Sequence, residues 1–129
     1  MVDHTEPAAS EQLAAALEAQ DAVAVAFALR NDHVVVPMLP VNGPPQVRVF
    51  RRGDADRYML LLFSSPENYR TMVPDEDDHR VLAYDAAALR EFLAENIGVL
   101  EAVWFDVAGP HAMQAAPQDV LDALLLDAN

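Results

Sequence analysis

The sequence predicts a single-domain α/β (α+β) protein in which helices flank a mixed, partly antiparallel sheet with a central hairpin. Two runs rich in β-branched and aromatic residues, 47–50 and 58–63, flank the cluster 53–56 (Gly-Asp-Ala-Asp), which is typical of a hairpin. The alanine-rich stretch 11–30 contains no glycine or proline and predicts helix ahead of the sheet. The length of 129 residues suits one domain with its own core.

The chain opens with residues 1–9, which are polar and should fray, so we expect the folded domain to span 10–129. Ser10 is a suitable N-cap for the first helix. One long helix or two shorter ones fit the region; Asp21 can cap a second helix, which favours a break near residues 20–21. Apolar positions at helical spacing are Leu13 and Leu17, followed on a rotated stripe by Val23, Phe27 and Arg30.

The β-branched run 33–39 predicts a strand that lies at an edge or ends at Pro37, because proline donates no backbone hydrogen bond. A proline- and glycine-rich loop at 40–45 leads to the hairpin. In its first strand Val47 and Val49 should face one side, and Arg48 and Phe50 the other. Its second strand is apolar throughout from 59 to 63, which predicts a central strand covered on both faces.

The segment after the hairpin begins a helix, because Ser65 can cap it, Pro66 suits the first position and Glu67 suits the first turn. Tyr69 and Met72 should anchor this helix to the core. Further strands are expected at 79–84, 100–107 and, as a short edge strand, 111–115. Two more helices should follow Asp85, with Leu89, Phe92 and Leu93 on one face, and Pro117, with apolar positions 120, 121, 124 and 125 on one face.

Charge and composition exclude several classes of function. The net charge of −13 argues against a nucleic-acid partner, since binding to phosphates requires clustered Lys and Arg. No stretch approaches the ~20 apolar residues of a membrane helix, and the N-terminus does not resemble a secretion signal. The chain has no cysteine and therefore no disulfide. We expect a cytoplasmic protein.

Catalytic and ligand motifs are missing from the sequence. The histidines at 4, 33, 79 and 111 lack the spacing of ligands on one helix face, and the acidic run 75–78 lacks the spacing of a calcium loop. No nucleophile elbow surrounds Ser64, and no glycine-rich phosphate loop exists. We therefore assign no catalytic, cofactor-binding or metal-binding residues. One alternative stays open, a metal-dependent hydrolase that uses His33 and His79 with nearby acids and Ser64.

Four arginines cluster around the hairpin of this otherwise acidic chain: Arg48, Arg51, Arg52 and Arg57. They could form a basic patch for an acidic partner, although edge strands also carry charge simply to prevent unwanted pairing. Trp104, between Val103 and Phe105 on a strand, is typical of a core or an interface. These arginines and Trp104 make up the expected interaction surface.

Several segments together resemble the SseB protein N-terminal domain family, over roughly residues 34–126. The segments are VVVPMLP, QVRVF, RYMLLLFSSPENY, VLAYDAAALREFL, NIGVLEAVWFDVAGP and APQDVLDALL. The matching positions are Val36, Pro37, Tyr58, Phe63, Ser65, Glu67 and Pro117. The resemblance implies a bacterial α/β domain without established enzymatic activity.

Two segments depart from the family pattern. Its Asn-Pro-Gly signature is replaced here by residues 106–110, Asp-Val-Ala-Gly-Pro. Ala116 stands where a capping Ser or Thr precedes Pro117, which predicts a helix start weaker by about 0.5–2 kcal/mol.

Taken together, these observations predict a non-catalytic module for protein interaction or regulation, with another protein or a second copy of itself as partner. The reasons are the missing catalytic constellation, the strand that is apolar on both faces, and the hairpin arginines. A small-ligand sensor with a pocket near Trp104 and Tyr58 is an alternative, beside the hydrolase.

Overall fold

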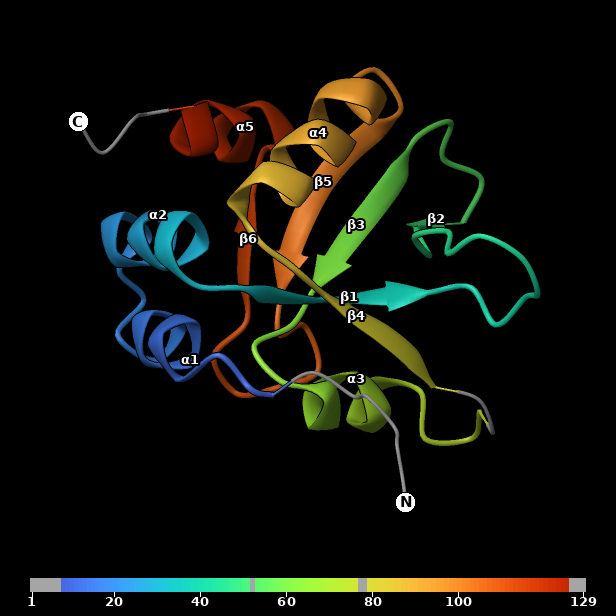
Figure 1. The fold of residues 1–129 in the computed structure, drawn as a ribbon, viewed down its shortest axis with the longest axis horizontal. Coiled ribbons are helices and arrows are strands. Elements are labelled where there is room, and N and C mark those ends of the chain that lie inside the picture. The colour runs from blue at the N-terminus through green and yellow to red at the C-terminus, as the bar shows by residue number, and fades with distance from the viewer. Residues whose placement is uncertain (1–7, 52, 77–78, 126–129) are drawn as a thin grey trace.

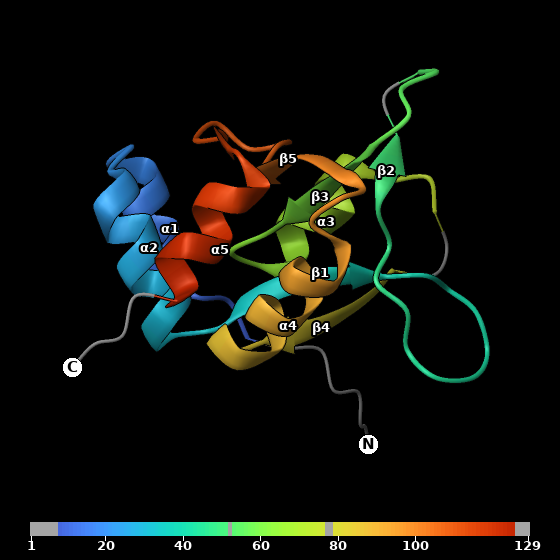
Figure 2. The ribbon, with the colours of Figure 1, turned by 90° about the horizontal axis from the view of Figure 1, so that it is seen from above.

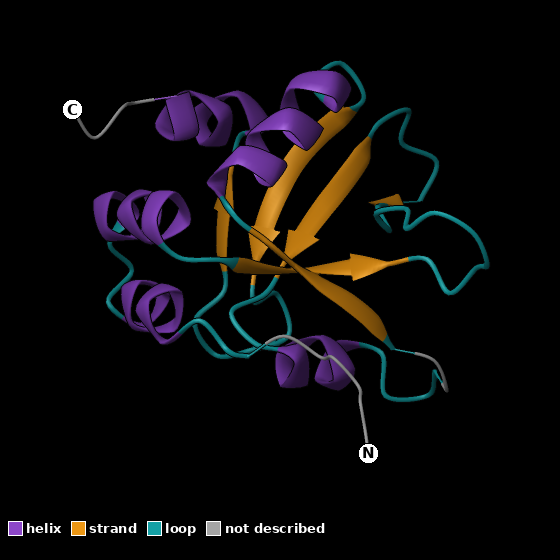
Figure 3. Ribbon diagram, in the orientation of Figure 1, coloured by secondary structure: helices purple, strands orange, loops and turns teal. Residues whose placement is uncertain are grey.

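The computed structural model of the chain describes residues 8–51, 53–76 and 79–125, in which helices and strands follow the predicted order. The helices are α1 (Glu11–Glu18), α2 (Ala22–Asn31), α3 (Pro66–Met72), α4 (Ala86–Asn96) and α5 (Pro117–Leu125). The strands are β1 (Val34–Met38), β2 (Phe50–Arg51), β3 (Tyr58–Leu62), β4 (Arg80–Tyr84), β5 (Leu100–Phe105) and β6 (Met113–Ala115). The α+β class with a mixed sheet is confirmed (Figures 1 and 3). The predicted fraying of residues 1–9 falls mostly outside the described residues.

Side-chain caps begin four of the helices, as the sequence predicts. Ser10, Asp21, Ser65 and Asp85 each accept a hydrogen bond from a backbone N–H in the first turn of α1, α2, α3 and α4. The long helical region is broken into α1 and α2 at Gln20, whose φ of 54° is left-handed. The break near residues 20–21 is therefore confirmed.

The strands form a four-stranded sheet and a separate two-stranded ribbon. The larger sheet has the order β2-β3-β5-β6, in which β3 and β5 are parallel and the other pairs are antiparallel. β1 and β4 form the antiparallel ribbon, which is joined to the sheet at the bridge between Val35 and Phe63. β3 is an interior strand, as predicted. β2 is an edge strand of only two residues, so the β2–β3 hairpin lies at one edge of the sheet.

Pro37 lies inside β1 at no cost to the ribbon. In a strand, backbone groups alternate between the two sides. Val35 bonds to Phe63 through its N–H (2.9 Å) and its carbonyl (3.0 Å), and the Pro37 carbonyl accepts from the N–H of Arg48 (2.9 Å). The backbone N–H and carbonyl groups of residues 35 and 37 therefore point away from β4. The N–H that Pro37 lacks would not have bonded to β4.

Two clusters of buried side chains lie on opposite faces of β3. Helices α1, α2, α4 and α5 cover one face and build the main core, which includes Leu60 and Leu62 of β3 (Figure 1). The second, smaller core contains Val35, Leu61, Phe63, Tyr69 and Val81, and therefore joins β3 to the ribbon and to α3. The prediction that both faces of β3 are covered is confirmed for Leu60, Leu61 and Leu62, which are all buried.

Three predicted core positions lie at the surface instead. Val23 and Phe27 are 77% and 49% exposed, and α2 buries Val25, Ala28 and Leu29. Because α2 is a separate helix, its buried stripe is set by its own packing and does not continue that of α1. Leu125, at the last described position of α5, is also exposed.

The start of α5 lacks a capping side chain, because Ala116 precedes Pro117 and its carbonyl alone contributes, accepting from Val120 N–H (3.1 Å). We expect Ala116→Asp to raise the free energy of unfolding by about 0.5–2 kcal/mol, since an aspartate there can accept from free N–H groups of the first turn. Urea denaturation measures the change. Ala94→Asp, at an exposed position inside α4, is the control and should be destabilising. Equal effects of the two substitutions would contradict the capping argument.

Candidate functional site

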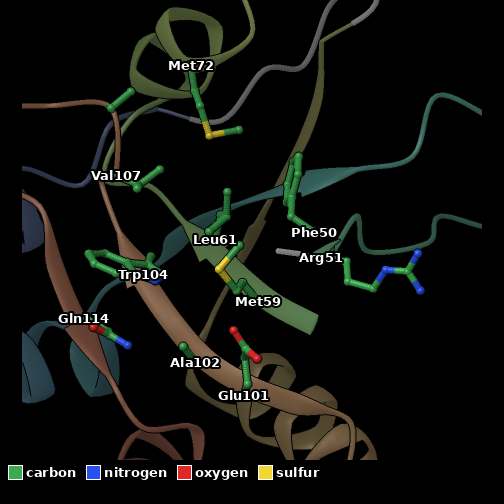
Figure 4. Close-up of a pocket in the computed structure, with 11 residues that line it drawn as sticks. Phe50, Arg51, Met59, Leu61, Met72, Glu101, Ala102, Trp104, Val107 and Gln114 are labelled. Atoms are coloured by element: carbon green, nitrogen blue, oxygen red, sulfur yellow. The ribbon is translucent and has the colours of Figure 1, made fainter. Parts of the chain in front are cut away.

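One face of the four-stranded sheet carries apolar side chains that no helix fully covers. Phe50 of β2 is paired with Met59 of β3, and Leu61 of β3 is paired with Trp104 of β5. Met72 of α3 and Val107, just after β5, close one side of this surface (Figure 4). These six residues, Phe50, Met59, Leu61, Met72, Trp104 and Val107, line an open depression of about 600 Å³, which we call the groove.

A shift of register shapes the wall of the groove. Between Tyr58 and Met59 the pairing advances by one residue on β3 but by two on β5, from Leu100 to Ala102. The extra residue in β5 is Glu101. As a result Leu100 lies in the main core, while Glu101, Ala102 and Trp104 line the groove. Irregularities of this kind redirect side chains next to functional surfaces.

The groove is apolar at its centre and polar at its rim. Met59, Met72 and Trp104 are half-buried, whereas Leu61 is buried against the second core. Arg51, Glu101 and Gln114 add polar groups around them, and Gln114 of β6 is the strand partner of Trp104 (Figure 4). Methionine and aromatic side chains adapt to apolar groups of different shapes, so this surface is suited to binding.

Trp104 and Tyr58 lie on opposite faces of the sheet, so the pocket that the sensor hypothesis placed near both of them is not formed. Tyr58 packs against the main core, whereas Trp104 lines the groove. The sequence does not show which strands pair, and therefore does not show that the register shift between β3 and β5 places these two side chains on different faces.

The four hairpin arginines do not act as one patch. Arg51 lies at the rim of the groove, and Arg57 is exposed in the turn before β3. No ion pair of either is found among the described residues. Arg52 lies outside the described residues. The structure thus brings together Arg51 and Trp104 of the expected interaction surface.

Arg48 is engaged within the protein. Its guanidinium donates to both carboxylate oxygens of Glu76 (2.6 and 2.7 Å) and to the hydroxyl of Tyr69 (2.8 Å), and it lies 4.8 Å from the ring centre of Phe50. The hydrogen bonds from Arg48 lower the pKa of Glu76, and they also raise the pKa of Arg48. Arg48 therefore joins the segment that leads into β2 to the turn after α3. It also packs on the ring of Phe50, which lines the groove.

The histidines of the hydrolase hypothesis are bonded to separate backbone segments. The ring of His33 lies 2.6 Å from the Ala8 carbonyl through Nε2 and 3.0 Å from Asp32 through Nδ1. The ring of His79 lies 2.6 Å from the Val73 carbonyl and contacts Tyr69 edge-on. Within the described ranges, no group of three or more metal-ligating side chains comes together.

Asp32 organises the N-terminal side of the molecule. Its pKa is lowered, first by the backbone N–H of His33 and then by the hydroxyl of Ser10 (2.9 Å). The N–H of Ser10 in turn donates to the Ser64 carbonyl (2.7 Å). These bonds tie the start of α1 to the end of β3.

Ser64 and Asp106 form a buried pair at the adjacent ends of the parallel strands β3 and β5. The N–H and hydroxyl of Ser64 donate to Oδ1 and Oδ2 of Asp106, at 2.7 and 2.6 Å, and Asn68 Nδ2 donates to the Ser64 hydroxyl (3.3 Å). Asp106 has a left-handed φ of 48°. Ser64 is therefore held in a structural contact with a carboxylate, and no histidine of the described residues takes part.

Sequence reasoning missed this pair, and of the six residues that define the groove it placed only Trp104 in an interaction surface. For the pair a signal was present, because a serine and an aspartate each follow an apolar strand directly, and the carboxyl ends of neighbouring parallel strands share one edge. For the groove no signal was present. The strand 59–63 is apolar throughout, so its sequence does not show which of its two faces is left without a covering helix.

With this geometry in place, comparison with protein families matches residues 9–122 to the SseB protein N-terminal domain. This chain belongs to that family. The SseB match spans every residue of the groove as well as the Ser64–Asp106 pair. No curated protein and no solved structure matches the chain. Among the described residues of this SseB domain, no helix is both long and apolar enough to cross a membrane.

Proposed function

We propose that this domain is a non-catalytic protein-interaction module, and that the groove binds a segment of a partner protein that carries apolar and acidic side chains. The proposal rests chiefly on one observation: Phe50, Met59 and Trp104 stand half-buried on a sheet face that no helix fully covers. Contiguous apolar surface of this kind, rimmed by polar groups, is characteristic of interaction sites.

Charge favours an acidic partner at this position. The chain carries a net charge of −13. Of the described hairpin arginines, Arg48 is paired with Glu76, whereas Arg51 and Arg57 are exposed. Arg51 at the rim of the groove has no ion-pair partner among the described residues, so it is available for a carboxylate. Binding should weaken as salt is raised, because exposed charge pairs are screened.

A small molecule is a weaker candidate for the occupant. The volume of about 600 Å³ lies within the range of ligand pockets, but the polar groups stand at the rim and do not converge on one point. Trp104 emission can be followed with peptides and with metabolites in turn, so the experiment below shows which of the two occupants binds.

Trp104 is the single tryptophan of the chain, so its fluorescence reports on the groove alone. A phage-displayed library of random peptides, selected on the native protein alone, supplies the probes. We expect selected peptides that combine apolar residues with Asp or Glu, that shift the Trp104 emission, and that bind Met59→Glu at least about tenfold more weakly. Arg51→Glu should weaken binding by roughly three- to tenfold.

Val23→Glu is the matched control, because it places the same charge on an exposed apolar position of α2, away from the groove. It should bind like the native protein. Circular dichroism confirms that each variant is folded. Enrichment of no peptide, or equal binding to Met59→Glu and the native protein, would overturn the proposal; a shift of Trp104 emission with metabolites alone would favour the sensor.

A further inference from the structure

Among the residues that the structure describes, no strand pairs with the outer edge of β4. β4 pairs with β1 on one side, and in Figure 2 it lies at the outside, with β1 between it and β3. Natural proteins usually protect such an edge with proline, charged side chains, a bulge or a covering segment. β4, Arg-Val-Leu-Ala-Tyr, contains no proline, its single charged residue, Arg80, stands at its first position, and its pairing with β1 is regular.

The direction of the open backbone groups follows from β1. The backbone groups of Val35 bond to Phe63 and therefore point away from β4, whereas those of Val36 point toward β4. Leu82 is the partner of Val36, so its backbone N–H and carbonyl point toward β1. The N–H and carbonyl groups of its neighbours Val81 and Ala83 point outward. No hydrogen bond to these four groups is found among the described residues.

The side chains of β4 are also partly open. Leu82 is 39% exposed and Ala83 is exposed, although both lie on a strand of a folded domain. The exposed leucine stands midway between the two residues with open backbone groups. The outward N–H and carbonyl groups thus lie one residue before and one residue after Leu82.

We propose that a second copy of this chain binds β4 antiparallel to itself, about a two-fold axis at Leu82. In that register Val81 lies opposite the partner's Ala83, and Ala83 lies opposite the partner's Val81. Each of these two pairs exchanges both hydrogen bonds, so all four open groups are satisfied. Leu82 contacts the partner's Leu82, and Arg80 stands across from the partner's Tyr84, so no like charges face each other on this strand.

The dimer joins two ribbons into one four-stranded sheet and leaves the groove uncovered, since no β4 residue lines it. The inference is therefore independent of the proposed function, and either can fail alone. Because each copy carries a net charge of −13, the two repel at low salt. Dimerisation should strengthen as sodium chloride is raised, opposite to the salt effect expected for a peptide in the groove.

Cross-linking tests the register directly, because the chain has no cysteine of its own. Opposite residues of a non-hydrogen-bonded antiparallel pair have Cα atoms about 4.5 Å apart, which a disulfide can span. Under mild oxidation at high salt, Leu82→Cys should form a covalent dimer at least about tenfold faster than Val99→Cys. Val99 is an exposed apolar residue outside β4 and serves as the matched control.

Sedimentation equilibrium of the cysteine-free protein provides the second measurement. At about 0.1–1 mM protein and high salt we expect the mass of a dimer, since a small interface gives low affinity. Ala83→Pro removes one outward donor, which an edge position tolerates, and should leave a folded monomer by circular dichroism. A native protein that stays monomeric, an Ala83→Pro variant that dimerises equally well, or equal cross-linking at positions 82 and 99 would each overturn the proposal.

Discussion

Replacement of Asp106 with alanine is expected to lower the free energy of unfolding by about 2–5 kcal/mol. The change removes both acceptors of Ser64, and the buried N–H of Ser64 then has no partner in the folded state. It also places alanine at a φ of 48°, where a Cβ is crowded unless a short polar side chain compensates. The two costs add because they arise from different parts of the residue.

Three variants separate these two costs in urea denaturation. Asp106→Gly removes the acceptors without the backbone cost and should be less destabilising than Asp106→Ala. Asp106→Asn tolerates the left-handed conformation and keeps one acceptor, so it should lose least. Ser64→Ala keeps the bond from the backbone N–H and removes only the hydroxyl. A loss below about 1 kcal/mol for Asp106→Ala would contradict a role of this carboxylate in joining β3 and β5.

Arg48→Ala is expected to lower the free energy of unfolding by about 1–3 kcal/mol. The substitution removes the hydrogen bond to the buried Tyr69 hydroxyl and the packing of the guanidinium over Phe50, besides the bond to Glu76. Arg48→Lys should recover only part of the loss, because an ammonium cannot donate to both oxygens of Glu76 and to Tyr69 in the same geometry. Arg57→Ala, at an exposed position of the same hairpin, is the control and should be close to neutral.

The pH dependence of stability provides a separate measurement of the same contact. The pKa of Glu76 is lowered in the folded protein, so the unfolded chain binds more protons at mildly acidic pH. The contribution of the pair is therefore complete above about pH 4.5, the ordinary value for Glu, and is lost as pH falls through the lower folded value. In Arg48→Ala the decline of stability below pH 4.5 should become shallower. Some decline should remain, since the pKa of Asp32 is lowered by other groups; an unchanged slope would contradict the assignment.

The order of helices and strands could be predicted from the sequence because each element carries a local signal. Ser10, Asp21, Ser65 and Asp85 mark helix starts by their own chemistry, and all four act as caps. The pairing of strands could not be predicted in the same way. That β1 and β4 form a ribbon apart from the main sheet depends on contacts between distant segments, which no local pattern encodes.

The candidate site was predicted only in part, and the reason is again non-local. Arg51 and Trp104 were expected in an interaction surface and both line the groove. Arg48 belongs to the same sequence cluster, but it precedes β2 and its guanidinium is bound by Glu76 and Tyr69 within the protein. The charge of a residue could be read from the sequence, whereas its partner could not.

The sharing of β1 and β3 between the two cores has a consequence for cooperativity. Successive residues of β1, Val34 and Val35, enter different cores, and so do Leu60 and Leu61 of β3. Neither strand can detach from one core while it stays in the other, so the two cores should melt in a single transition. Trp104 reports on the second core and the far-ultraviolet signal reports mainly on helices around the first, so the two unfolding curves should coincide.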